Sequence, residues 1–371
     1  MIIRTITCHH AYNHGAMLQA YALVKYLRTL GHDAAIIDYW PQYMPRNQVN
    51  FDWVPKRYNL FGVRSLYRWQ KKSYYQLEQS RHDCLESFLN QHVPVTDREY
   101  DSIDQLKQEP PAADIYIAGS DQIWNTTFPN GNDYAYYLSF GSPRRKVSYA
   151  ASFATTSLKE GTQDFVQAQL KNFDAISVRE HSGLDILEQL GYKGVVVVDP
   201  VFLLNPAQWD ELLGLEFDEH EDYILAYDFE LRNGPIGHIV KRLAAQLGCK
   251  VYSVSPFRHR YVDKHFVAIS PDKFVSLIKH ARCVISNSFH GTAFSLIYNK
   301  DFFVVNRKDG LNVRMRDLLN HYDLEDRLIS MDTNNEILLK GINYERVNQQ
   351  LCCDVDFSKS FLLNQIELAN G

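Results

Sequence analysis

The sequence predicts an α/β protein built from two doubly wound, Rossmann-like lobes that face a central cleft. Short apolar runs of strand length alternate with amphipathic helical segments, an order typical of parallel sheets. The alternation repeats after a connection that begins near residue 206, and 371 residues exceed what one core comfortably holds. We therefore expect a first lobe of residues 1–205, a second lobe of residues 206–350, and a final helix in 351–371 that packs back on the first lobe.

The first lobe opens with a strand, a helix and a second strand. Ile2–Thr7 is apolar enough for a buried strand. Gly15–Leu30 carries apolar residues at helical spacing, and Gly31 suits the end of that helix. Ala34–Asp38 is a second apolar run. A strand-helix-strand unit this short predicts a parallel pair of strands.

Residues 41–77 break this alternation with a segment rich in aromatic and basic residues. One interpretation is an irregular insertion whose charges are solvated, and we favour it. The other is a lid or docking surface for an anionic, partly apolar acceptor, because aromatic rings stack on sugars while Lys and Arg bind phosphates. A helical run over 76–89 follows.

Regular alternation then resumes and continues through the second lobe. In the first lobe we expect strands at 114–118, 146–150, 175–178 and 195–198, with helices at 158–171 and 182–190. A helix beginning at Pro206 connects the lobes. In the second lobe we expect strands at 223–227, 250–254, 283–285 and 302–305, with helices at 237–247, 271–280 and 291–298. The last helix is expected from about Asp354.

Composition and charge exclude several classes of protein. Hydrophobic residues make up 45% and charged residues 22%, values ordinary for a globular protein. The formal net charge of -5 argues against nucleic acid as a partner. The chain offers neither about 18 consecutive apolar residues nor a secretory signal. We expect a cytoplasmic protein with at most peripheral membrane contact.

The six cysteines show neither disulfide-framework nor zinc-finger spacing. The nearest approach to a metal motif is Cys8-His9-His10, with His14 nearby, because thiolates and imidazoles bind zinc. Adjacent residues of an extended chain point to opposite faces, and no second ligand pair lies at metal-site spacing. We therefore expect no metal.

Polar residues collect where the expected strands end, at the sheet edge where open α/β proteins bind ligands. His290 lies in a strand-to-helix turn, followed by Gly291 and Thr292, whose amides begin a helix that suits an anion. It is either a functional residue or simply part of the turn. The turn at Asn13 and Gly15 is a second candidate anion site or an ordinary helix start.

Two other strand ends add candidates. Ser120 and Asp121 follow one apolar strand, and Arg179 directly follows another. A guanidinium at that position either binds an oxyanion through two hydrogen bonds or pairs with a carboxylate such as Glu180. The chain contains no nucleophile elbow, P-loop or dinucleotide-binding glycine motif. The sequence therefore does not support hydrolysis by a serine nucleophile, nucleotide hydrolysis or hydride transfer.

Six motifs, in chain order, resemble those of the polysaccharide pyruvyl transferase family. They are N-x-G-A-x-L-Q-A-Y-A-L at 13–23, D-x-x-I-A-G-S-D-Q-I-W-N at 114–125, Y-A-A-S-F at 149–153, S-V-R-E-x-S-G at 177–183, D-P-V-F-L-L at 199–204 and S-N-S-F-H-G-T at 286–292. The resemblance runs from about residue 1 to 320. It implies a glycosyltransferase-B-like fold and transfer of the pyruvyl group of phosphoenolpyruvate to sugar hydroxyls, usually as a cyclic ketal, in surface or exopolysaccharide synthesis.

The resemblance also implies roles for single residues. His290 is similar to the family's catalytic histidine, and Arg179 to the arginine that holds phosphoenolpyruvate. The chain departs from the family motif at Ser288, where an arginine is usual, so one positive charge is missing. Candidates to replace it are Arg258, Arg260, Arg307, Arg314 and Arg316. The expected donor site comprises Arg179, Ser288, Gly291, Thr292, Asn13, Gly15, Ser120, Asp121 and Arg307.

The implied reaction needs a general acid/base and an anion cradle, but neither a cofactor nor a metal. Protonation of the methylene carbon of the enol phosphate creates an oxocarbenium-like centre, a sugar hydroxyl adds, phosphate leaves, and a second hydroxyl closes the ketal. The acceptor saccharide is free, lipid-linked or nucleotide-linked. The alternatives are a glycosyltransferase that uses a nucleotide sugar and a noncatalytic sugar-binding relative.

Overall fold

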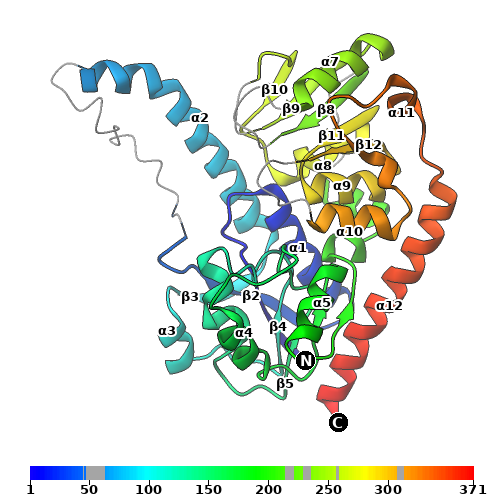
Figure 1. Ribbon diagram of the computed structural model, residues 1–371. Helices are drawn as coiled ribbons and strands as arrows, with labels where there is room; N and C mark the ends of the chain where they lie inside the picture. The colour runs from blue at the N-terminus through cyan, green and yellow to red at the C-terminus, as the bar shows by residue number, and fades with distance from the viewer. Residues whose placement is uncertain (45, 47–62, 214–220, 229–234, 256–258, 307–312) are drawn as a thin grey trace.

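The computed structural model describes residues 1–44, 46, 63–213, 221–228, 235–255, 259–306 and 313–371. It confirms the predicted fold class, because two parallel sheets with helices form two lobes, one above the other in Figure 1. Each sheet reverses its strand order beside its first strand, as doubly wound sheets do. That reversal lies between β1 and β4 in one sheet and between β8 and β11 in the other.

The first sheet has the order β3-β2-β1-β4-β5 with every pair parallel. Its strands are β1 (Ile2–Ile6), β2 (Asp33–Tyr39), β3 (Val95–Tyr100), β4 (Ile115–Ala118) and β5 (Arg145–Ser148). Two short parallel strands, β6 (Ser177–Val178) and β7 (Val195–Val196), form a ladder of their own. Isolated parallel bridges join Ala175 to Val147 and Val178 to Ala151, so this ladder continues the sheet beyond β5.

The second sheet has the order β10-β9-β8-β11-β12-β13, also parallel throughout. Its strands are β8 (Tyr223–Tyr227), β9 (Lys250–Val254), β10 (Lys264–Phe266), β11 (Cys283–Ser286), β12 (Asp301–Val305) and β13 (Leu328–Ile329).

The helices connect these strands in chain order. In the first lobe they are α1 (His14–Thr29), α2 (Val63–His92), α3 (Ile103–Gln108), α4 (Gln163–Leu170) and α5 (His181–Gln189), with 3-10 turns at Pro129–Asn132, Tyr134–Tyr137 and Pro200–Leu203. From the connection onward they are α6 (Pro206–Leu213), α7 (Pro235–Leu247), α8 (Pro271–His280), α9 (Phe289–Ile297), α10 (Val313–His321), α11 (Asn335–Leu339) and α12 (Tyr344–Asn370), with a 3-10 turn at Glu325–Arg327. Among the described residues, none of these helices combines the length and apolar character needed to cross a bilayer.

Helix α1 lies at the junction of the lobes and is buried on nearly all sides, with only Lys25, Arg28 and Thr29 exposed. It contacts α8 and α9 of the second lobe. The ring of Trp209 on α6 lies 5.8 Å from that of Tyr21 on α1 and 5.0 Å from that of Phe294 on α9. One apolar cluster therefore continues from the first lobe into the second and holds the first turns of α1 and α9 in place.

The C-terminal helix α12 runs from the second lobe along the side of the molecule to the first (Figure 1). It begins at Tyr344 rather than near Asp354, earlier than the sequence pattern suggested. Near its end, Arg145 at the start of β5 donates to the Gln365 side chain at 2.8 Å, and Leu362 is fully buried. One continuous helix thus connects the second lobe to the first.

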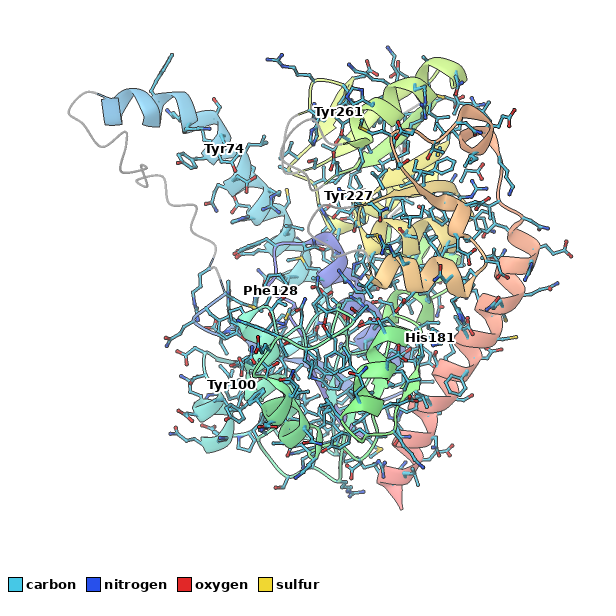
Figure 2. All side chains as sticks on the ribbon, in the orientation of Figure 1. Tyr74, Tyr100, Phe128, His181, Tyr227 and Tyr261 are labelled. Atoms are coloured by element: carbon cyan, nitrogen blue, oxygen red, sulfur yellow. The ribbon has the colours of Figure 1, made fainter. Side chains whose placement is uncertain are left out.

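The prediction of irregular structure up to residue 77 is wrong from Val63 onward, because helix α2 begins there. Residues 45 and 47–62 of that segment lie outside the described residues. The start of α2 extends away from both lobes (Figures 1 and 2), where Trp69 is 73% exposed and Tyr74 43% exposed. A helix that buries few of its residues lacks the apolar stripe by which sequence reasoning finds helices.

Candidate active site

The first turns of α1 and α9 meet directly at the junction of the lobes. A Cβ atom placed on Gly15 would lie 2.0 Å from Nδ1 of His290, far inside contact distance, so only glycine leaves room for this imidazole. His290 is 5% exposed and is the second residue of α9. The turn that follows a strand of the first lobe therefore contacts the turn that follows a strand of the second lobe.

A buried guanidinium organises the charges beside His290. Arg179 donates from Nη1 to Asp199 Oδ2 at 2.5 Å and from Nη2 to Asp121 Oδ1 at 3.1 Å, and its side chain is fully buried. Ser120 donates to the same Asp199 oxygen at 3.0 Å. His290 Nε2 lies 3.7 Å from that oxygen. Arg179 thus pairs chiefly with Asp199 and Asp121, since Glu180 Oε2 is farther from its Nε, at 3.6 Å.

A second guanidinium reaches the cluster from α10. Arg314 Nη1 lies 3.5 Å from Asp121 Oδ1, and the Arg314 side chain is 10% exposed. Arg179 and Arg314 both pack over the Phe289 ring, with their Cζ atoms 4.5 and 5.7 Å from its centre. Asp121 therefore lies between two cations, and its backbone has a left-handed φ of 72°.

The other arginines proposed to replace the charge missing at Ser288 are not seen at the cluster. Arg316 donates to Asn306 at 3.3 Å on the exposed side of α10, and Arg260 is exposed. Arg258 and Arg307 lie outside the described residues. Among the described candidates, Arg314 is the one placed in the site.

Burial dominates the protonation of the cluster. It lowers the pKa of His290 to about 4, against the opposing effect of Asp199 and Asp121. It also lowers the pKa of Arg314 to about 10, and the nearby Arg179 adds to that effect. Burial alone would raise the pKa of Asp121, but Arg179 and Arg314 hold it below its ordinary value. His290 is therefore neutral at pH 7, while Asp121 and both arginines stay charged.

Four buried side-chain atoms around the cluster have no hydrogen-bond partner among the described residues. They are Nε of Arg179, Nε of Arg314, Oε2 of Glu180 and Nε2 of His290. Buried polar atoms are seldom left without partners, and each exception requires an explanation, such as a ligand, an ion or a water at that position. Nε of Arg179 and Oε2 of Glu180 face one another at 3.6 Å, so Nε of Arg314 and Nε2 of His290 are the positions that suit the oxygens of an anion.

The remaining predicted residues lie at the two helix starts. Asn13 Oδ1 accepts from the amides of Gly15 at 2.9 Å and Ala16 at 3.2 Å, so it caps α1 itself. Ser288 precedes α9 without capping it through its side chain, and its carbonyl accepts from the Thr292 hydroxyl at 3.1 Å. A Cβ atom placed on Gly291 would lie 2.6 Å from Ser286 Oγ, so Gly291 permits close packing of α9 on β11.

The structure brings together Gly15, Ser120, Asp121, Arg179 and His290. Asp199 belongs to this set as well. The sequence placed it at the end of an expected strand, the same signal that pointed to Arg179, but it was not included in the expected donor site.

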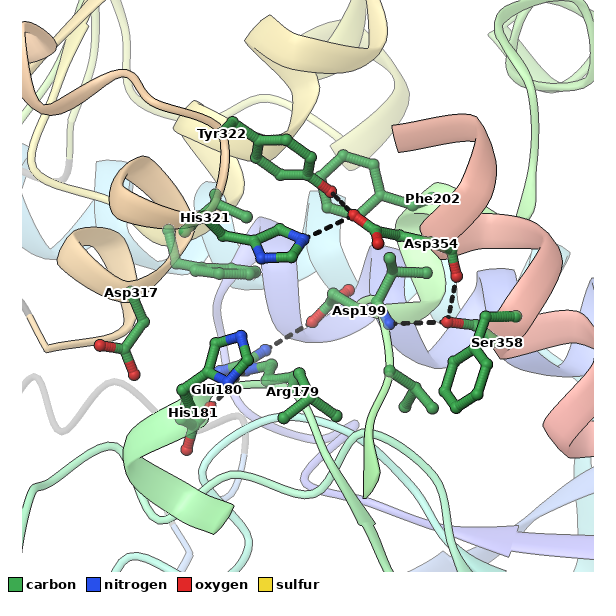
Figure 3. Close-up of a pocket in the computed structure, with 16 residues that line it drawn as sticks. Arg179, Glu180, His181, Asp199, Phe202, Asp317, His321, Tyr322, Asp354 and Ser358 are labelled. Atoms are coloured by element: carbon green, nitrogen blue, oxygen red, sulfur yellow. Dashed lines mark hydrogen bonds and ion pairs between the residues drawn. The ribbon is translucent and has the colours of Figure 1, made fainter. Parts of the chain in front are cut away.

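A cavity of about 160 Å³ approaches the cluster from the side of α12. Arg179, Asp199 and Phe289 form one wall, and Asp354 of α12 forms another. In Figure 3 the His321 ring and the Tyr322 hydroxyl both meet the Asp354 carboxylate, at 2.7 and 3.0 Å. His290 does not line this cavity.

A second cavity, of about 130 Å³, lies between the lobes near the start of α1. Asn13 and His14 line it from α1, Arg81 from α2, and Tyr227 and Ser255 from the second lobe. Arg81 donates from Nη1 to the Tyr12 carbonyl at 2.9 Å. Its Nη2 donates to Glu78 at 3.2 Å, so the charge of Arg81 is paired within α2.

The fold and the site define a two-lobe α/β protein with doubly wound parallel sheets and a buried charged site at the junction of the lobes. The family model of polysaccharide pyruvyl transferases matches residues 13–309, which include every described member of this site except Arg314. The chain belongs to the polysaccharide pyruvyl transferase family.

Solved structures resemble the chain only distantly, and no curated protein matches its sequence. The Staphylococcus aureus MnaA-UDP structure is 14% identical over 98% of this chain and 95% of its own, with a TM-score of 0.48. Escherichia coli ADP-heptose lipopolysaccharide heptosyltransferase II is 10% identical over 97% of this chain and all of its own, with a TM-score of 0.38. With TM-scores below 0.5, neither structure indicates what this chain binds.

Proposed function

We propose that the protein transfers the pyruvyl group of phosphoenolpyruvate to hydroxyls of a saccharide and forms a ketal. The observation that carries the proposal is the pair of guanidinium groups of Arg179 and Arg314 beside His290, at the junction of the lobes in a member of this family. Nε of Arg314 and Nε2 of His290 have no hydrogen-bond partner among the described residues. Phosphoenolpyruvate carries a carboxylate and a phosphate, and guanidinium groups bind both kinds of oxygen.

In this proposal Arg314 supplies the charge that the family motif places at residue 288. Arg179 and Arg314 already share one carboxylate, that of Asp121, at 3.1 and 3.5 Å. An anion of the donor takes the place of this carboxylate between the two guanidinium groups.

His290 acts as the general acid/base. Its Nε2 has no hydrogen-bond partner among the described residues and is therefore available to a ligand. Burial lowers the pKa of His290 to about 4 in the free protein, whereas a bound phosphate dianion raises it. Histidine then takes up a proton as the donor binds, delivers it to the methylene carbon, and accepts a proton from the attacking sugar hydroxyl.

A thermal-shift comparison tests the proposal. Phosphoenolpyruvate at 1 mM is compared with UDP-glucose at 1 mM, because a ligand that binds only the folded state raises the melting temperature. We expect stabilisation by phosphoenolpyruvate, and less of it in Arg314→Gln, with Arg316→Gln as the matched control on the exposed side of α10. Stabilisation by UDP-glucose alone would instead favour a glycosyltransferase.

A further inference from the structure

Two histidines and an aspartate converge at the carboxyl ends of β1 and β2, outside the charged cluster. His10 Nε2 lies 2.6 Å from Asp38 Oδ1, and His9 Nε2 lies 3.5 Å from the same oxygen. The three ligand atoms all lie within 4.8 Å of one another. The His9 side chain is fully buried, and that of Asp38 is 18% exposed.

The hydrogen bonds of His9 leave its Nε2 as a bare acceptor. Its Nδ1 lies 3.1 Å from the Thr7 carbonyl, which can only accept, so Nδ1 carries the proton of a neutral ring. Nε2 is then the ring atom that faces the Asp38 carboxylate, 3.5 Å from Oδ1, and within the described part of the chain it has no hydrogen-bond partner. A cation between Nε2 and the carboxylate, either a proton or a metal ion, would satisfy both groups.

The arrangement matches what metal sites require. A histidine ligand usually donates its other ring N–H to a carbonyl or carboxylate, which fixes the tautomer, as Thr7 does for His9. Ligands about 2.05 Å from a tetrahedral zinc ion are roughly 3.3 Å apart, close to the 3.5 Å between His9 and Asp38. His10 and Asp38, which are hydrogen-bonded at 2.6 Å, must move apart by about 0.7 Å to admit the ion. Trp40 stacks on the His10 ring at 3.9 Å and holds its orientation.

We propose that His9, His10 and Asp38 bind a divalent transition metal, with Zn²⁺ as the favoured ion. Two imidazoles and one carboxylate suit such an ion, and three protein ligands leave a position for water or a substrate oxygen. The site does not depend on the proposed transferase activity.

The expectation that adjacent histidines point to opposite faces is wrong at this position. It assumed an extended chain, but the backbone turns after Thr7, with the His9 amide donating to the Thr7 carbonyl at 2.9 Å. The two rings consequently lie 4.1 Å apart. His14, the other histidine considered with them, faces Ile269 instead, with its Nε2 3.1 Å from that carbonyl.

A metal at this position would brace the loop that leads into α1. Thr7, whose carbonyl orients His9, also donates from Oγ1 to the Ser120 carbonyl at 2.8 Å. The ligands therefore connect β2 and the loop after β1 to the turn that carries Asp121. We expect the ion to raise the stability of the first lobe, because a cation that binds only the folded state adds its binding free energy.

The test uses Zn²⁺ alone, added to chelator-treated protein and followed by calorimetry and melting. Cys352 and Cys353 are adjacent and exposed, so both are first changed to serine to remove adventitious binding. We expect one Zn²⁺ per chain and a raised melting temperature. Asp38→Asn and His9→Gln should each weaken binding by more than about 100-fold, whereas the exposed His92→Gln should not.

Co²⁺ provides a readout that does not depend on whether the variants fold. Bound at this site in the serine-substituted background, it should give the visible absorption of a low-coordinate ion with nitrogen and oxygen ligands. Absence of stoichiometric binding would show that a proton occupies the cluster instead and would overturn the proposal. Equal Zn²⁺ affinity in folded His9→Gln would overturn it as well.

Discussion

Gly15 of the first lobe lies against His290 of the second so closely that a Cβ atom on Gly15 would be 2.0 Å from the imidazole Nδ1. This contact joins two strand-end turns that are far apart in the sequence. It positions His290 beside Asp199 and, through it, beside Arg179. Because Gly15 has no side chain, the two lobes can approach closely enough to hold the His290 imidazole in this position.

We expect Gly15→Ala to displace His290 and lower turnover at least tenfold. The added methyl group must push the imidazole or the lobes apart, and overpacking of this kind costs about 1–3 kcal/mol. Steady-state rates and melting curves measure both effects. Gly341→Ala is the matched control, because a Cβ atom there would meet nothing nearer than Asp301 at 3.9 Å. Equal behaviour of the two variants would show that the contact with His290 has no functional consequence.

Sequence reasoning identified the fold class because apolar runs and helical periods report burial directly. It missed short strands and elements that bury few of their side chains. Strand β3 has mostly exposed and half-buried residues, and β10 spans three residues at a sheet edge. Helix α10, which carries Arg314 into the site, has only Met315 and Leu319 buried, so no apolar stripe marked it.

The candidate site was also only partly predictable. Strand-end positions pointed to Arg179 and His290, because parallel strands present their carboxyl ends at one edge. Which carboxylates surround Arg179 depends on the packing of β6, β7 and β4, which no local pattern encodes. The convergence of His9 and His10 depends on a backbone turn that the sequence does not specify.

Removing Arg179 should destabilise the protein mainly through the carboxylates that it leaves behind. We expect Arg179→Ala to lower the free energy of unfolding by about 3–5 kcal/mol, because it removes the cation from the buried ion pair with Asp199. Arg179→Ala with Asp199→Ala should cost clearly less than the sum of the two single changes. Urea midpoints of the four proteins in this cycle measure the coupling. Additive costs would mean that the two side chains contribute independently.

Stability should fall as the pH drops from about 6.5 to about 4. Burial lowers the pKa of both His290 and His14 to about 4, while an unfolded histidine titrates near 6.5. Between these values the unfolded chain binds protons that the folded chain does not, so each histidine contributes a slope of about 1.4 kcal/mol per pH unit. His290→Gln should make the slope of the melting temperature shallower in this window, and exposed His92→Gln should leave it unchanged.

Asp121→Asn should tighten the binding of phosphoenolpyruvate about tenfold, equivalent to about 1.4 kcal/mol. The change removes the negative charge that now lies between Arg179 and Arg314, and asparagine tolerates the left-handed φ of this residue. Calorimetric titration of the variant and of the exposed control Asp164→Asn measures the difference. Weaker binding in Asp121→Asn would place this carboxylate among the groups that hold the donor rather than compete with it.

The most direct test of the central claim is phosphate release from phosphoenolpyruvate, measured with a panel of hexosides and UDP-hexoses for the unchanged protein and His290→Gln. Glutamine retains a hydrogen-bonding group but cannot exchange a proton near pH 7. We predict that the variant keeps its melting temperature at pH 7 and still binds phosphoenolpyruvate, though more weakly without the protonated imidazole, while phosphate release at saturating phosphoenolpyruvate falls roughly 100-fold or more. Undiminished phosphate release in His290→Gln, or an unchanged protein that does not bind phosphoenolpyruvate, would contradict the account.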